Sequence, residues 1–154
     1  KMIGGHTITN DDINSFRKAT SASTDSNTKF NSQESDFYLN IIDKINSSSS
    51  DSRYTIIAFA SESSNSIVGH EINHASFYLQ PLYKKTVLNF WQKNVSANDK
   101  SEIRSILGKL YNAKEDNIII DEFQAYLMQE EEQKNPLAKF LPKYKRNLKK
   151  KLNL

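Results

Sequence analysis

The chain has 154 residues, a net charge of +3 and no cysteine. This length is enough for one modest hydrophobic core, and no stretch approaches the roughly 20 apolar residues that a membrane-spanning helix needs. The lack of cysteine excludes disulfides, thiolate metal sites and a cysteine nucleophile. It also fits a protein that works in a reducing compartment. Any metal site must therefore be built from His, Asp and Glu.

Residues 1–52 are expected to form a helical and loop segment packed on the core. Thr9-Asn10-Asp11-Asp12 precedes two apolar residues at helical spacing and predicts a capped short helix. Residues 21–35 are rich in Ser, Thr and Asn and predict a long loop. Apolar residues recur at helical spacing over 35–46 and predict an amphipathic helix, which a serine-rich linker follows at 47–52.

Residues 53–133 are expected to form the main core. The segment 54–60 is β-branched and aromatic between serines, which is typical of a strand. Helices are then predicted to begin near Ser66, at Pro81, at an Asn98-Asp99 cap and at Ile118. These elements predict a single domain with an α+β fold that is predominantly helical.

The C-terminal segment 134–154 holds eight basic residues and no acid. Pro136 is expected to open a basic helix, although Pro142 argues against one continuous helix. Two interpretations stay open: attachment to an acidic partner or an anionic membrane, or a closing helix that packs on the body. Nucleic-acid binding is not expected, because no recognised module accompanies the charge.

Residues 70–74 read His70-Glu71-Ile72-Asn73-His74. On a helix, residues four apart share a face with Cβ atoms about 5–6 Å apart. Two imidazoles at that separation can both reach one ion at a zinc–nitrogen distance of about 2.0–2.1 Å. Glu71 would sit beside the metal and act as the general base on its activated water. The uncharged flanks suit a helix at the floor of a cleft.

A third ligand is not supplied by histidine. Gln80 stands where a third histidine six residues after His74 would be needed, and His6 lies at the start of the chain without structural signals. A carboxylate remains, and either Asp121 or Glu122 could supply it, although each could also be an ordinary acid at a helix start. Glu122 is favoured, because Phe123, Tyr126 and Leu127 then define a buried face alongside it.

These two motifs, with the small residue Ala125 three positions after Glu122, resemble the gluzincin zinc metallopeptidases over about residues 53–130. The resemblance implies a minimal zincin-like fold with a small sheet beside the His70–His74 helix. It implies one zinc ion per chain, held by His70, His74 and Glu122. One departure is Tyr126, which replaces an Asp that orients a histidine ligand in thermolysin-like relatives, so the support of the ligands must differ.

The same resemblance implies how a substrate would be held. Ile57, Ala58 and Phe59 would form an edge strand that binds an extended peptide through backbone hydrogen bonds. Tyr126 or Tyr111 could stabilise the oxyanion or support the ligands. Each tyrosine could equally be a packed core residue.

The sequence therefore predicts a monomeric zinc-dependent endopeptidase that acts on a protein or peptide substrate. Its Lys-, Asn- and Ile-rich composition suggests a bacterial source. By analogy with small cysteine-free zincins, it could be an effector that is delivered into a host cell and cleaves a host protein. The expected location is the bacterial cytoplasm or a host cell. The alternative is a catalytically inactive or structural helical domain that binds an acidic partner through its basic tail.

Overall fold

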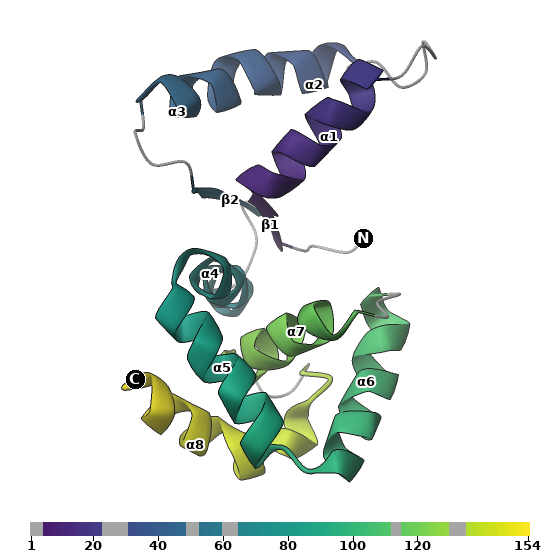
Figure 1. Cartoon of the computed structure of the whole chain (residues 1–154), viewed down its shortest axis with the longest axis vertical. Coiled ribbons are helices and arrows are strands. Elements are labelled where there is room, and N and C mark those ends of the chain that lie inside the picture. Colours follow the sequence, from purple (N-terminus) through teal and green to yellow (C-terminus); the bar gives the residue numbers. More distant parts are fainter. Residues whose placement is uncertain (1–4, 23–30, 49–52, 60–64, 112–114, 130–134) are drawn as a thin grey trace. The chain divides into compact units, whose positions relative to one another are not determined.

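The computed structural model describes residues 5–22, 31–48, 53–59, 65–111, 115–129 and 135–154 (Figure 1). These residues are mostly helical, with one antiparallel sheet of two strands, β1 (Gly5–Thr9) and β2 (Thr55–Phe59). The predicted α+β fold, predominantly helical, is therefore confirmed. None of the described helices is both long enough and apolar enough to cross a bilayer.

By its internal contacts the chain divides into two compact units. The smaller unit is Ile8–Ile56, and the larger one joins Lys1–Thr7 to Ile57–Leu154. The predicted boundary at 52/53 lies close to the observed one. The basic segment 134–154, which the sequence set apart, belongs to the larger unit.

The smaller unit contains α1 (Asn10–Ala22), α2 (Ser32–Phe37), a π-helical turn η2 (Tyr38–Ile42) and α3 (Asp43–Ser48). The predicted cap of α1 is confirmed, because the Asp12 N–H donates to Thr9 Oγ1 and the Thr9 N–H donates to the Asp12 carboxylate.

Asn31 and Glu34 make the same reciprocal pair of hydrogen bonds at the start of α2. The prediction of a loop over the whole of 21–35 was therefore wrong at both ends, since α1 runs to Ala22 and α2 starts at Ser32. The predicted helix 35–46 is interrupted by the π-helical turn. Of its apolar residues, Ile42 is fully buried while Leu39 and Ile41 are exposed.

The larger unit is built from helices whose ends follow local signals. They are α4 (Asn65–Leu79), α5 (Pro81–Asn94), α6 (Ala97–Tyr111), α7 (Asp116–Met128), the 3₁₀ turn η3 (Ala138–Phe140) and α8 (Leu141–Leu152). Pro81 lies in the first turn of α5, where its missing N–H costs nothing.

Three predicted helix starts were wrong. Helix α7 begins at Asp116, two residues before the predicted start at Ile118. Ser96 caps α6 by accepting a hydrogen bond from the Asp99 N–H at 3.2 Å, so Asn98 and Asp99 lie inside the first turn. The last helix begins at Leu141 and not at Pro136. Pro142 lies in its first turn, which explains how the helix tolerates it.

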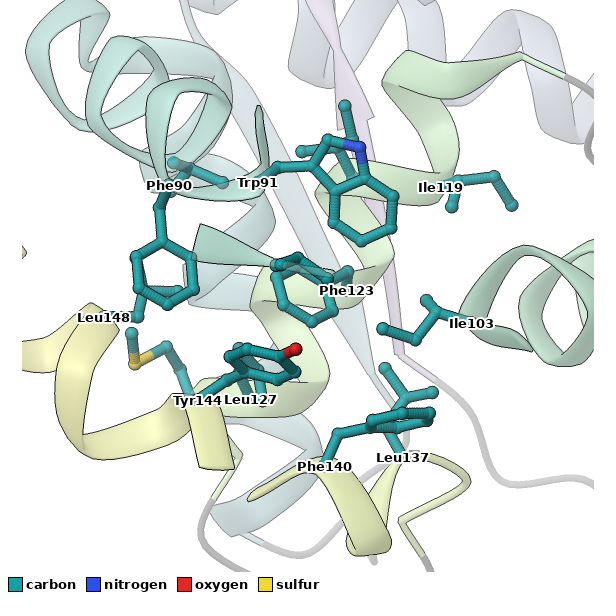
Figure 2. Close-up of a cluster of buried hydrophobic side chains, with 14 of the residues drawn as sticks. Phe90, Trp91, Ile103, Ile119, Phe123, Leu127, Leu137, Phe140, Tyr144 and Leu148 are labelled. Carbon is teal, nitrogen blue, oxygen red and sulfur yellow. The ribbon is translucent and has the colours of Figure 1, made fainter. Parts of the chain in front are cut away.

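Helix α7 is the centre of the larger unit and packs against α4, α5, α6 and α8. The core that surrounds it is aromatic and aliphatic (Figure 2). Phe123 of α7 is fully buried, with the ring of Trp91 from α5 4.9 Å away between centroids and the ring of Tyr144 from α8 6.3 Å away. Both rings meet Phe123 edge to face, the arrangement that aromatic quadrupoles favour. One side of α7 is therefore held rigidly, and its other side faces α4.

Candidate metal centre

Helices α4 and α7 run side by side in opposite directions. Near one end of the contact, Gln129 Nε2 donates to Ser66 Oγ at 2.9 Å. Further along, Gln124 Nε2 donates to the carbonyl oxygen of Asn73 at 3.1 Å. Ala125 lies between these bonds on α7 and is fully buried. A small side chain here allows the two backbones to approach closely, which brings the start of α7 against the second half of α4.

Three ligand atoms converge at this contact, His70 Nε2, His74 Nε2 and Glu122 Oε2. The two imidazole nitrogens are 3.1 Å apart, and the carboxylate oxygen lies 3.6 Å from His70 Nε2 and 3.7 Å from His74 Nε2. Two atoms bound tetrahedrally to zinc at about 2.0–2.1 Å are about 3.3 Å from each other. The spacing of the three atoms is therefore close to that of three corners of a tetrahedral zinc site.

The ligand set also contains one polar atom that the described residues leave without a hydrogen bond. Glu122 is only 9% exposed, and among the described residues its Oε2 has no hydrogen-bond partner. A buried carboxylate oxygen without a partner is costly, by about 1–3 kcal/mol or more. A divalent cation would satisfy this atom and both imidazole lone pairs at once. The residues present thus fit a zinc ion.

Asp121 orients one of the two imidazoles. Its Oδ1 accepts a hydrogen bond from His74 Nδ1 at 2.9 Å. This bond places the proton of the neutral ring on Nδ1 and leaves the Nε2 lone pair pointing toward His70 and Glu122. Burial lowers the pKa of His74, but the hydrogen bond and charge of Asp121, with the charges of Glu122 and Glu71, outweigh burial and raise it. Glu122, and not Asp121, therefore faces both imidazoles.

Gln124 supports the position of Asp121 through a hydrogen bond. This glutamine is fully buried, and its Nε2 also donates to Asp121 Oδ1 at 3.0 Å. Its Oε1 accepts a hydrogen bond from the Tyr83 hydroxyl of α5 at 2.7 Å. Burial, and then the charge of Asp121, raise the pKa of Tyr83 to about 12, so this hydroxyl remains a donor. The polar chain from Tyr83 to His74 ties three helices together.

Glu71 points to a different neighbour. Its side chain is buried, and its Oε2 accepts a hydrogen bond from the Thr7 hydroxyl of β1 at 2.7 Å. The same hydroxyl lies 3.1 Å from the backbone carbonyl oxygen of Glu71. The carboxylate is thus held at one oxygen by a strand that precedes it by 64 residues. It does not belong to the group of three converging ligand atoms.

Two tyrosines lie close to the ligand group. The ring of Tyr126 packs against His70, with centroids 4.6 Å apart, and its hydroxyl pairs with the hydroxyl of Tyr111. Burial and that hydrogen bond, with the charge of Glu122, raise the pKa of Tyr111. Burial also raises the pKa of Tyr126. Both phenols are therefore neutral donors at physiological pH, and Tyr111 is 39% exposed.

The other predicted positions do not belong to the group of converging ligand atoms. Ile57, Ala58 and Phe59 form the end of β2, and β1 is the strand that pairs with it. It is β1, through Thr7, that contacts the site. His6 belongs to β1, whose formation the sequence did not predict.

The sequence did not predict the roles of three residues that support the site. Thr7 was not considered, although the β-branched run Thr7-Ile8-Thr9 is a strand signal. Gln124 interrupts the apolar pattern of α7, and a polar residue at a core position is a sign of a buried network. Asp121 was considered as a ligand or a cap, whereas the structure shows it as the partner of His74.

The likeness to gluzincins is carried by two short motifs, His70–His74 on α4 and Glu122 on α7. Comparison of the chain with protein-family models, with curated proteins and with solved structures gave no match. The geometry of its own side chains is therefore the basis for assigning chemistry to this site.

Proposed function

We propose that this protein is a zinc-dependent endopeptidase. The observation that carries the proposal is the convergence of His70 Nε2, His74 Nε2 and Glu122 Oε2, with separations of 3.1–3.7 Å and an otherwise unsatisfied carboxylate oxygen. Three protein ligands leave a fourth tetrahedral position, which is the pattern of a catalytic rather than a structural zinc site.

A zinc ion held by these ligands would supply Lewis acidity and activate a water molecule near neutral pH. Glu71 is the residue that would take the proton from this water and later pass it to the leaving amine. The Thr7 hydroxyl holds Oε2 of Glu71, so Oε1 is the oxygen left for proton transfer. A buried carboxylate with one fixed oxygen has little freedom to turn away from the reaction.

The paired hydroxyls of Tyr111 and Tyr126 supply the donor that the developing oxyanion needs. Because the pKa of each phenol is raised, both keep their protons at the pH at which water attack occurs. In this proposal, the carbonyl oxygen of the substrate would accept a hydrogen bond from one hydroxyl of the pair.

An extended peptide would add to the sheet by backbone hydrogen bonds. Within the described residues, β1 and β2 pair only with each other, so each offers a second edge. The contact between Thr7 and Glu71 favours the edge of β1 over the predicted edge at Ile57, Ala58 and Phe59 as the one nearer the reacting bond. A protein substrate, including a host protein, remains the proposed target.

Zinc content and one isosteric substitution test this proposal. Purified protein should contain one zinc ion per chain. Glu71→Gln should keep that zinc and lose cleavage of an unfolded protein substrate by about 100-fold or more, because a general base contributes about 10²–10⁴-fold. Glu115→Gln, on an exposed acid at the start of α7, is the matched control and should cleave normally. Equal cleavage by Glu71→Gln and the parent would reject the role of Glu71.

The alternative is a non-catalytic interaction domain, with or without a structural metal. The observation that favours it is the basic surface of α8, which has no part in the metal centre. Zinc at one equivalent without any cleavage by the parent protein would support this alternative.

A further inference from the structure

Helix α8 has two chemically different faces. Leu141, Tyr144 and Leu148 lie on one face and are buried in the core of the larger unit. Figure 2 shows Tyr144 and Leu148 in this core. This face accounts for the predicted packing of the tail as a closing helix. The positive charge of the segment lies on the remaining surface, and packing does not explain it.

Four basic residues gather along a groove on that surface. Lys145, Arg146, Lys149 and Lys150 line it, with Leu141 and Leu154 as apolar contributions, and its volume is about 640 Å³. The four positions are spaced i, i+1, i+4 and i+5, so they form two rows along one side of the helix. We call this surface the α8 basic groove.

Among the residues that the structure describes, most of this charge has no acidic partner. Two lysines nearby are already paired, Lys139 with Glu102 and Lys143 with Asp99, both across to α6. Within the described part of the chain, Arg146, Lys149 and Lys150 have no acidic partner. The segment from Lys134 onward contains no acid that could provide one. Lys145 donates to the backbone carbonyl oxygen of Gln129 at 2.9 Å, and that contact leaves its charge uncompensated.

We propose that the α8 basic groove binds an acidic peptide segment of a partner protein. Within each row the two cations are about one helical turn apart, so they match carboxylates presented at similar intervals. The guanidinium of Arg146 can also bind a carboxylate through two hydrogen bonds. Pro142 and Leu154, which are exposed and line the groove, offer contacts for apolar side chains within the same segment. A hollowed surface with both kinds of contact suits a peptide that mixes acidic and apolar residues.

The structure disfavours two other polyanions. An interfacial helix binds a bilayer by inserting its apolar face, whereas the apolar face of α8 is already buried in the core. Single-stranded nucleic acids are usually held by exposed aromatic rings on which bases stack. The aromatic residue of α8 is Tyr144, which is 3% exposed. The groove therefore offers positive charge, but it lacks the free apolar face that inserts into a bilayer and the exposed aromatic rings on which bases stack.

Binding at this groove does not depend on the metal centre, because none of its residues belongs to that centre. The test uses the full chain and a fluorescent peptide that alternates Glu and Leu, with anisotropy as the readout. The variant is Arg146→Glu, Lys149→Glu, Lys150→Glu, and a milder version places Gln at the same positions in case charge reversal impairs folding. The matched control reverses three exposed lysines on other helices, Lys85→Glu, Lys93→Glu, Lys109→Glu, and has the same net charge.

We expect the parent and the control to bind the peptide with affinities within about threefold of each other. The groove variants should bind at least about tenfold more weakly, and a peptide with Gln in place of Glu should not bind. Raising the salt concentration from 50 to 500 mM should weaken binding by the parent, because exposed charges are screened. Equal losses in groove variant and control would overturn the proposal. Preferential binding to phosphatidylserine vesicles or to an oligonucleotide over the peptide would overturn it as well.

Discussion

The imidazole of His74 and the carboxylate of Asp121 show how a side chain outside the ligand set can govern the site. Their 2.9 Å hydrogen bond selects the tautomer of His74 whose Nε2 faces the other ligand atoms. In this chain the acid is the residue just before Glu122, and the position four residues after Glu122 holds Tyr126.

Removal of Asp121 should weaken zinc binding without removing a ligand. Asp121→Ala should lower zinc affinity about 10–100-fold, which is the usual effect of losing an outer partner of a ligand histidine. Gln124→Leu should lower it as well, because Asp121 then loses the donor that holds it. Competition with a fluorescent chelator measures both. Asp116→Ala, at an exposed position of the same helix, is the control, and an Asp121→Ala affinity equal to that of the control would reject the orienting role.

Thr7 offers a second test at the level of single residues. Thr7→Val keeps the shape of the side chain and removes the hydroxyl that holds Glu71 Oε2. We expect kcat to fall about tenfold with KM and zinc content unchanged, since the general base loses its fixed position. Thr7→Ser restores the hydroxyl and should recover most of the activity. A matching loss in the Ser variant would mean that Thr7 acts through packing and not through its hydrogen bond.

At the scale of secondary-structure elements, α6 and α8 are joined by Asp99. The carboxylate of Asp99 accepts hydrogen bonds from Lys143 Nζ and from the hydroxyl of Tyr144, which is itself an acceptor for the Ser96 N–H. The hydrogen bond from Lys143 and then the one from Tyr144 lower the pKa of Asp99 from 3.8 to about 2. The position in the first turn of α6 also suits a negative charge.

This lowered pKa predicts a pH-dependent contribution to stability. A carboxylate whose pKa is lower in the folded state stabilises the fold fully above its unfolded pKa, and the contribution is lost as pH falls through the folded value. Asp99→Asn should therefore lower the free energy of unfolding at pH 7. The difference from the parent should shrink as pH falls from about 4 to 2, as measured by urea denaturation. Glu115→Gln is the control, and a difference that does not change with pH would contradict the assigned ion pair.

At the scale of the whole molecule, the candidate metal centre lies within the larger unit, between helices that share its core. Zinc that binds only the folded state must stabilise that unit by mass action. At a free zinc concentration 100 times the dissociation constant, the free energy of unfolding should rise by about 2.7 kcal/mol. The chain has one tryptophan, Trp91, and it is 4% exposed in this core. Its fluorescence therefore reports the unfolding of the larger unit without a contribution from Ile8–Ile56.

We expect zinc at that concentration to raise the melting temperature seen by Trp91 by roughly 10–15 °C. Addition of a chelator should reverse the shift. His70→Ala with His74→Ala removes both imidazole ligands and should melt at the same temperature with and without zinc. A shift that persists in this double variant would place the zinc elsewhere on the protein.

The sequence by itself determined the features that depend on neighbouring residues. The spacing of His70 and His74 places both on one face of a helix, the run at 54–60 predicts β2, and Pro81 marks the start of α5. The capping pair of Thr9 and Asp12 is equally local. Such features are set by helical geometry and by the backbone groups left unpaired at helix ends, which act over a few residues.

Only the tertiary structure decided which distant residues support the site. Thr7 reaches Glu71 across 64 residues, and Gln124 reaches the backbone of Asn73 across 51. The choice of Glu122 to face the imidazoles, with Asp121 behind His74, follows from the way α7 lies against α4. No local pattern encodes these pairings, because they depend on how buried faces fit together and on which polar groups find partners in the core.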